Sequence, residues 1–233
     1  MDSLHLLSLL LQYPTLELAG ALGELRDRLA ADKTLPADTA ERLAPLIDRL
    51  SAQDIYAAQE TYVELFDRGR ALSLHLFEHV HGESRDRGQA MVDLRERYVA
   101  AGLDSVANEL PDYLPLFLDY CSTLPEAAAR AMLAEPGLVL VALASRLADR
   151  GSDYAPVLAL LCDIAGVEMD EEAANSLPPP EDPETLAELD AEWEEEEIRF
   201  TSELPDPGAA CPQASAMLRR MIEDHIPAGS ERN

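Results

Sequence analysis

Three histidines stand close together in the first half of the chain, and their side chains could bind a metal. His75 and His79 are four residues apart, so they would share one face of a helix, and His81 follows two residues later. Imidazole nitrogens are zinc ligands, and the carboxylates of Glu78 and Glu83 stand among them. The spacing is not H-E-x-x-H, however, and the sequence has no matching carboxylate motif elsewhere. A metal site is therefore one alternative, and hydrogen-bonded, half-buried histidines are the favoured one.

The histidines belong to a segment, residues 62–88, that mixes apolar and charged side chains more densely than an ordinary helical core. Glycines divide it into short pieces. Its charged residues include Asp67, Arg68, Arg70, Glu78, Arg85, Asp86 and Arg87. These charges either form salt bridges between neighbouring elements or bind a ligand, and the sequence leaves both open. Such a mixture indicates a surface groove or a binding site.

No set of residues typical of catalysis is present in the sequence. Ser73 lacks the G-x-S-x-G setting of a hydrolase nucleophile, and Cys121 has no histidine near it in sequence. The three cysteines form no C-x-x-C pair, which excludes a zinc ribbon or a disulfide framework. We therefore expect a protein that is not an enzyme and binds no cofactor. The alternative is a metal-dependent helical hydrolase that uses His75, His79 and His81.

The elements that must position these residues are predicted to be helices. Alanine and leucine are abundant, aromatic residues make up only 5% of the chain, and no alternating strand pattern occurs. The nearly uninterrupted apolar run Leu138–Leu147 predicts a central buried helix. Pro111 suits the first turn of a helix that continues to Leu118. The fold class is therefore all-α, a single compact bundle of several helices.

Charge divides the chain into two predicted parts. The formal net charge is −27, and residues 168–206 contain sixteen acidic residues and one basic residue. We expect a helical domain over residues 1–167 and an acidic, proline-containing arm over 168–233, largely disordered, with a short amphipathic helix at 213–225. So acidic a chain does not favour binding to nucleic acid or to an anionic membrane.

The amino terminus predicts where the protein acts. Its apolar run is too short to span a bilayer, and an acidic residue stands where a signal peptide needs positive charge. We expect a cytoplasmic protein that does not insert into the membrane.

The same segment resembles the signature of a known family. It reads FDRGR at 66–70, FEHVHG at 77–82 and SRDRG at 84–88; downstream stand ELPDYLPLFL at 109–118 and EWEEEEIRF at 192–200. These runs are similar to those of the NarJ family, the chaperones also called nitrate reductase delta subunits. The resemblance covers most of residues 1–200.

The resemblance implies both a fold and a partner. The fold would be the all-helical one shared with chaperones of the TorD and DmsD type. The client would be the apo catalytic α subunit of respiratory nitrate reductase, bound at its amino-terminal segment. The chaperone would hold that subunit in the cytoplasm until the molybdenum cofactor is inserted and the complex docks on its membrane anchor. The machinery that delivers the cofactor is a second partner that the resemblance suggests.

Apolar side chains beside acidic ones in the signature predict a groove for the client peptide. The predicted helix from Pro111 to Leu118 would form one wall. The residues expected to bind the client are Tyr62, Phe66, Asp67, Arg70, Leu72, Leu74, His75, Phe77, Glu78, His79, His81, Asp112, Tyr113 and Leu116. Histidines in this groove predict a client affinity that changes across the imidazole range, about pH 5.5 to 8.

Overall fold

The regular structure of the protein is helical. The computed structural model describes residues 2–81, 85–103, 109–177 and 179. Its helices are α1 (Asp2–Leu11), α2 (Leu16–Ala31), α3 (Thr39–Ala52), α4 (Ile55–Phe66), the 3-10 helix η1 (Arg70–Leu72), α5 (Leu76–His81), α6 (Arg85–Ala100), α7 (Leu114–Thr123), α8 (Glu126–Ala134), α9 (Gly137–Asp149), α10 (Ala155–Ala165) and α11 (Glu171–Ser176). In the described ranges, the only strand-like pairing is an isolated antiparallel bridge between His75 and Tyr113. The prediction of an all-α fold is confirmed.

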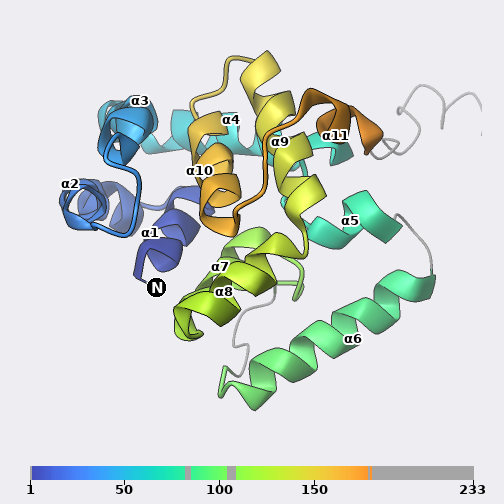
Figure 1. The fold of residues 1–233 in the computed structure, drawn as a ribbon. Coiled ribbons are helices and arrows are strands. Elements are labelled where there is room, and N and C mark those ends of the chain that lie inside the picture. The colour runs from blue at the N-terminus through green and yellow to red at the C-terminus, as the bar shows by residue number, and fades with distance from the viewer. Residues whose placement is uncertain (1, 82–84, 104–108, 178, 180–233) are drawn as a thin grey trace, which may run out of the picture. The chain divides into compact units, whose positions relative to one another are not determined.

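Two apolar helices, α9 and α10, pack against each other in the core (Figure 1). All side chains from Val139 to Ala144 in α9 are buried, which confirms the predicted central helix, although Leu138 at its start is half exposed. Helix α1 packs on α7 and also touches α10. A fully buried leucine stabilises a fold by about 1.5–3 kcal/mol. The burial of these leucine-rich helices is therefore the main source of stability.

Short polar residues and a glycine define where helices begin and end. Thr15 precedes α2, and its Oγ1 accepts a hydrogen bond from the Leu18 N–H at 3.1 Å. Asp54 precedes α4, and its Oδ1 accepts a hydrogen bond from the Tyr56 N–H at 2.9 Å. Gly166 ends α10 with a φ of 71°, a left-handed conformation that strains other residues. These ends supply partners for backbone groups that a helix leaves unpaired.

The segment before α7 differs from the prediction. The helix expected from Pro111 begins only at Leu114, where Pro115 occupies its first turn. Residues 110–113 form a turn instead, in which the Tyr113 N–H donates to the Leu110 carbonyl at 3.0 Å. This turn lies beside residues 74–76: the Leu76 N–H donates to the Asp112 carbonyl at 3.0 Å, and the Leu114 N–H donates to the Leu74 carbonyl at 2.8 Å. A proline can start a helix at either position, so tertiary pairing decided which of the two does.

The predicted arm lies largely outside the described residues, so it stays a prediction, as does the helix expected at 213–225. The chain divides into two units, Met1–Pro183 and Glu184–Asn233, and every described residue belongs to the first. The beginning of the arm contains α11, which packs against α9. Just before it, the chain crosses the start of α9 so closely that a Cβ on Gly137 would lie 2.9 Å from a Val167 methyl carbon.

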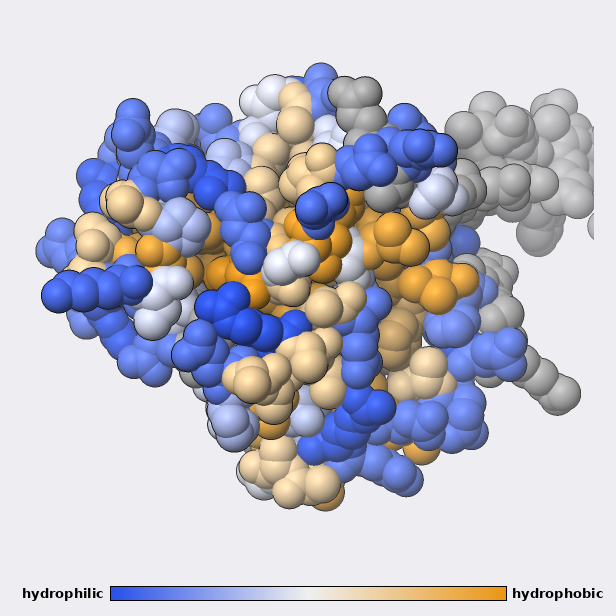
Figure 2. Space-filling view, viewed as in Figure 1, coloured by the Kyte–Doolittle hydropathy of each residue, from blue (hydrophilic) through white to orange (hydrophobic). Residues whose placement is uncertain are grey.

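Apolar side chains reach the surface on one face of this unit. Figure 2 shows them as an orange band that interrupts an otherwise hydrophilic surface. Among the described helices, no single one is long and apolar enough to cross a membrane. Only α8 and α9 taken together reach that length and composition, and they are bent by 69° at their junction.

Candidate functional site

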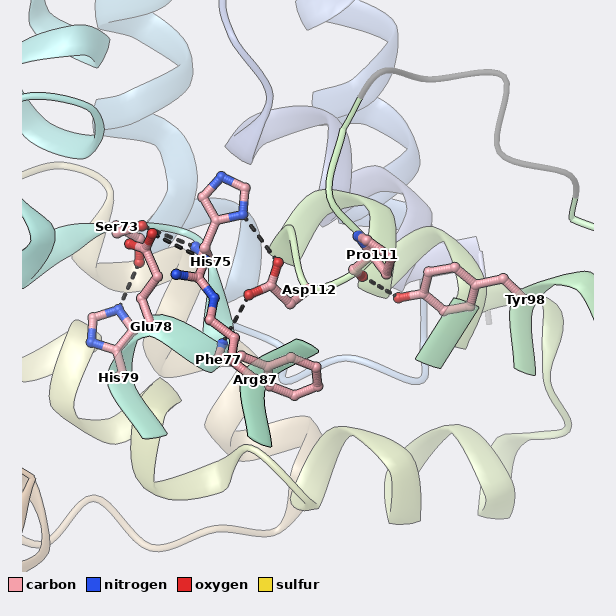
Figure 3. Close-up of polar contacts among 9 residues, drawn as sticks. All are labelled: Ser73, His75, Phe77, Glu78, His79, Arg87, Tyr98, Pro111 and Asp112. Carbon is pink, nitrogen blue, oxygen red and sulfur yellow. Dashed lines mark hydrogen bonds and ion pairs between the residues drawn. The ribbon is translucent and has the colours of Figure 1, made fainter. Parts of the chain in front are cut away.

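A buried carboxylate joins the two signature segments. Asp112 has no exposed surface, and its Oδ2 accepts a hydrogen bond from the Phe77 N–H at 3.0 Å, in the first turn of α5 (Figure 3). Its Oδ1 lies 3.2 Å from Nδ1 of His75. A buried carboxylate is tolerated only when such partners replace its water. Asp112 therefore caps α5 from a distant part of the sequence and holds His75 in place.

His75 is the histidine that reaches the surface beside this junction. Its side chain is 27% exposed, and its ring lies against Tyr113 with centroids 5.5 Å apart. Burial opposes the charged imidazolium, but the hydrogen bond and the negative charge of Asp112 outweigh it and raise the pKa of His75. The pair favours a protonated His75 at the edge of the site.

The other two histidines point elsewhere. His79 is buried, and its Nε2 lies 2.8 Å from the Ser73 carbonyl, to which it donates (Figure 3). Its Nδ1 is buried and has no partner among the described atoms. Burial lowers the pKa of His79, which keeps the ring neutral. The His81 ring packs edge-on against Phe77.

This divergence removes the basis for a metal site. In the part of the chain that the structure describes, no three His, Cys, Asp or Glu side chains come together as ligands. Glu83, which the sequence offered as a further ligand, lies outside that part. The metal-dependent hydrolase therefore has no structural support, and the histidines act as hydrogen-bonded or packed side chains.

A chain of tyrosines ties the end of α1 to the start of α7. The Tyr62 hydroxyl lies 2.9 Å from the carbonyl of Leu11, to which it donates, and 2.9 Å from the Tyr113 hydroxyl. Tyr13 packs edge-on against Tyr62 with centroids 5.5 Å apart. Burial raises the pKa of Tyr62 and brings the pKa of Tyr113 to about 12, so both phenols are neutral donors. The wall that these rings form is fixed by hydrogen bonds.

Some of the signature charges are structural. Glu78 and Arg87 form a partly buried ion pair, 3.1 Å apart, that joins α5 to α6. Arg68 and Glu64 are largely exposed and 3.9 Å apart, a geometry that contributes little. The signature charges are therefore of two kinds: the Glu78–Arg87 pair joins two helices, whereas the Arg68 side chain is largely exposed to solvent.

Two surface depressions flank the contact between His75 and Tyr113. The first, which we call the mixed-charge depression, measures about 310 Å³ and is lined by Phe66, Asp67, Arg68, Gly69, Arg70, Ser73, His75 and Glu78. The second, which we call the acidic depression, measures about 340 Å³ and is lined by Gln12, Tyr13, Thr15, Glu109, Tyr113, Pro115, Leu116 and Asp119. A peptide lying across the two rings would reach both.

The predicted binding residues divide into two groups by exposure. The buried ones are Tyr62, Phe66, Leu72, Leu74, His79 and Asp112. Those at least partly exposed are Asp67, Arg70, His75, Phe77, Glu78, His81, Tyr113 and Leu116. In this conformation the first group mainly supports the surface, although Phe66 also lines the mixed-charge depression. Phe77 and His81 of the second group line a further, mostly apolar depression with Leu76, Val80, Leu94 and Phe117. Which of these residues bind the client stays a prediction.

Sequence reasoning missed the residues that line the acidic depression from outside the signature. Gln12 and Tyr13 directly follow α1, and Asp119 comes from α7. Glu109 stands at the start of the signature run 109–118. The one available signal was an exposed tyrosine next to Pro14, at the end of a leucine-rich helix.

Comparison with known proteins assigns the chain to a family. A family model described as "Nitrate reductase delta subunit" matches residues 32–159. The chain belongs to this family. The matched range includes the signature, the Asp112 junction and the first part of α10. The resemblance in the signature is therefore confirmed.

Two relatives from Escherichia coli strain K12 match most of the chain. The "Nitrate reductase molybdenum cofactor assembly chaperone NarJ" is 44% identical over 201 residues, which is 86% of this chain and 85% of the relative. The "Probable nitrate reductase molybdenum cofactor assembly chaperone NarW" is 36% identical over 232 residues, 97% and 95% of the two chains. A third relative, the "Probable nitrate reductase molybdenum cofactor assembly chaperone NarJ" of Bacillus subtilis, is 32% identical over 121 residues, which is 52% of this chain and 66% of the relative.

These names describe assembly and not catalysis. The names of the family and of the relatives confirm the prediction that this protein is not an enzyme, and the hydrolase alternative is not supported.

Proposed function

We propose that this protein is a chaperone for the apo catalytic α subunit of nitrate reductase. It binds the amino-terminal segment of that subunit in the cytoplasm, before the molybdenum cofactor is inserted and before the enzyme docks at the membrane. The names of the relatives support the nitrate reductase partner. The observation that carries the binding role is the exposed wall of His75 and Tyr113, held from below by the buried Asp112 and flanked by two depressions.

The surface fits a peptide better than a small molecule. Neither depression is enclosed, and both are lined by polar and apolar side chains together. Enclosed, mostly apolar pockets are typical of small-molecule sites. We place the client over the partly exposed residues of the predicted set, from Asp67 and His75 to Tyr113 and Leu116. The buried members of the set, including Tyr62 and Leu74, hold that surface in shape.

The energetics suit a complex that must later release its client. Four apolar anchors of a peptide would gain about 6–12 kcal/mol on burial. Ordering a flexible segment takes back about 2–5 kcal/mol, and association itself costs about 4 kcal/mol or more. At the favourable limit about 6 kcal/mol remains, which corresponds to a dissociation constant of roughly tens of micromolar. The machinery that delivers the cofactor is part of the same proposal as a second partner, and the chaperone itself carries no cofactor.

Titration calorimetry tests the proposal. The probe is a synthetic peptide of the first 20 or so residues of the α subunit from the same organism, with a scrambled peptide as control. We expect saturable heat for the natural peptide only. Co-purification with the apo α subunit in a strain that cannot make the molybdenum cofactor tests the biological side. Absence of both the heat and the co-purified subunit would refute the proposal.

A further inference from the structure

We propose that the acidic depression is the subsite that reads a basic residue of the client, through the carboxylates of Glu109 and Asp119. The inference rests on the proposed function and assigns it a specificity-determining surface outside the signature. The occupant is a client segment in which a lysine or arginine stands next to an apolar side chain. The basic group would face the two carboxylates, and its apolar neighbour would pack on Tyr13 and Leu116.

The charge of the depression is one-sided. Glu109 and Asp119 line it, and none of its described lining residues is lysine or arginine. The mixed-charge depression differs, because Arg68, Arg70 and His75 stand beside its carboxylates. A cation gains electrostatic energy in the first setting and is partly repelled in the second. Of the two, the acidic depression is the one that selects a positive side chain.

The two carboxylates of the depression come from different parts of the structure, a helix and the loop before it. Asp119 is on α7 and lies 2.8 Å, through Oδ1, from Nδ1 of His5 on α1. The Asp119 side chain is 34% exposed, so the carboxylate is still open to solvent. Glu109 precedes the turn that carries Asp112. The packing of α1 against α7 brings the residues that follow α1 to the same opening.

Apolar surface lies directly beside these charges. Tyr13 is 43% exposed, although its ring packs on Tyr62. Leu116, also partly exposed, lines the same depression. Tyr113 lines it as well and is held by its hydrogen bond to Tyr62. A preformed apolar floor of this kind lowers the entropic cost of binding an amphipathic segment.

The polar side chains that remain on the rim already have partners. Gln12 donates through Nε2 to the Ser8 hydroxyl at 3.3 Å. The Thr15 hydroxyl accepts the Leu18 N–H in the cap of α2. Neither brings positive charge to the opening, although the imidazole of His5 already contacts Asp119 from α1. Recognition of a basic group therefore falls to Glu109 and to the part of Asp119 that stays open to solvent.

Charge reversal on both partners tests the inference. The full chain carrying Glu109→Lys and Asp119→Lys is titrated with the natural amino-terminal peptide and with a peptide whose lysines and arginines are changed to glutamate. Glu24→Lys with Asp27→Lys is the matched control, because both residues are exposed acidic positions on α2 with the same change in net charge. Thermal unfolding of each variant shows whether it is folded, and Asp119→Asn is a milder second variant.

We expect the reversed variant to bind the natural peptide about tenfold more weakly and the reversed peptide more tightly than the wild type does, while the control changes by about twofold or less. Equal weakening in the reversed and control variants would overturn the inference and point to net charge alone. Unchanged binding of a peptide whose basic residues are all changed to glutamine would also overturn it. If the wild type binds no peptide at all, the proposed function fails first, and the subsite falls with it.

Discussion

The two depressions share a wall but are built in different ways. The mixed-charge depression comes mostly from one continuous stretch, residues 66–78, and carries charges of both signs. The acidic depression is assembled from the residues just after α1 and the region of Glu109 to Asp119. His75 faces the first and Tyr113 the second, and both are positioned through Asp112 and Tyr62. A single buried layer thus supports two surfaces of different charge.

The largest expected effect is the loss of the shared support. Asp112→Ala removes the acceptor for the Phe77 N–H and for His75, and it leaves a buried donor unpaired. We expect the free energy of unfolding to fall by about 2–4 kcal/mol, since hydrogen bonds to a buried charge are strong. Chemical denaturation measures this change.

Asp112→Asn is the matched control for that variant. The amide oxygen can still accept from the Phe77 N–H, but the negative charge beside His75 is lost. We expect Asp112→Asn to lower the free energy of unfolding and to weaken peptide binding less than Asp112→Ala does. If Asp112→Ala left the stability and peptide binding unchanged, the two surfaces would not depend on a common support.

An intermediate effect is expected from the tyrosine pair. Tyr113→Phe removes one hydroxyl from the wall, at a cost of about 1 kcal/mol. Tyr62→Phe costs more, about 1–3 kcal/mol, because the Leu11 carbonyl also loses its donor. The double variant should fall short of the sum, and a thermodynamic cycle measures this coupling. Strict additivity of the two stability losses would show that the two hydroxyls do not act together. Tyr113, and with it the acidic depression, would then not depend on the buried Tyr62 hydroxyl.

A smaller effect is expected from pH, with opposite signs for two histidines. The pKa of His75 is raised above 6.5, so its contribution to stability is full below that pH and is lost as pH rises through the folded value. The pKa of His79 is lowered, so its contribution is present above pH 6.5 and is lost as pH falls through the folded value.

Single His→Gln variants, unfolded at several values between pH 5 and 8, separate the two slopes. Client affinity should also change over this range, because His75 borders the mixed-charge depression. A flat affinity profile, or one that persists in a variant lacking His75, His79 and His81, would argue against histidine contact with the client.

The smallest expected effect concerns surface charge in the mixed-charge depression. Arg68→Gln should change the free energy of unfolding by no more than about 0.5 kcal/mol, because the side chain is largely exposed. Arg87→Gln should cost about 1 kcal/mol, because its pair with Glu78 is partly buried. Equal losses in the two variants would mean that the exposed charges are as structural as the buried pair.

Much of the fold could be predicted from the sequence because its signals are local. Apolar residues at helical spacing predicted the helices, and the apolar run Leu138–Leu147 predicted the central one. The family signature could also be recognised in the sequence, since it is a run of neighbouring residues. The start of α7 could not be predicted, because Pro111 and Pro115 are both acceptable first-turn residues.

What only the tertiary structure decided is the direction and exposure of the site residues. Spacing placed His75 and His79 on one helix face, but His75 precedes α5 and turns toward Asp112, and His79 is buried against Ser73. Sequence alone predicted a groove lined by Tyr62, Phe66, Leu72, Leu74, Phe77 and the segment from Pro111 to Leu118; the packed core buries the first four, and Phe77 stays partly exposed. The acidic depression needed α1 and α7 to meet, a contact between segments about a hundred residues apart in the chain. Local periodicity determines which residues can be buried, whereas long-range packing determines which ones are.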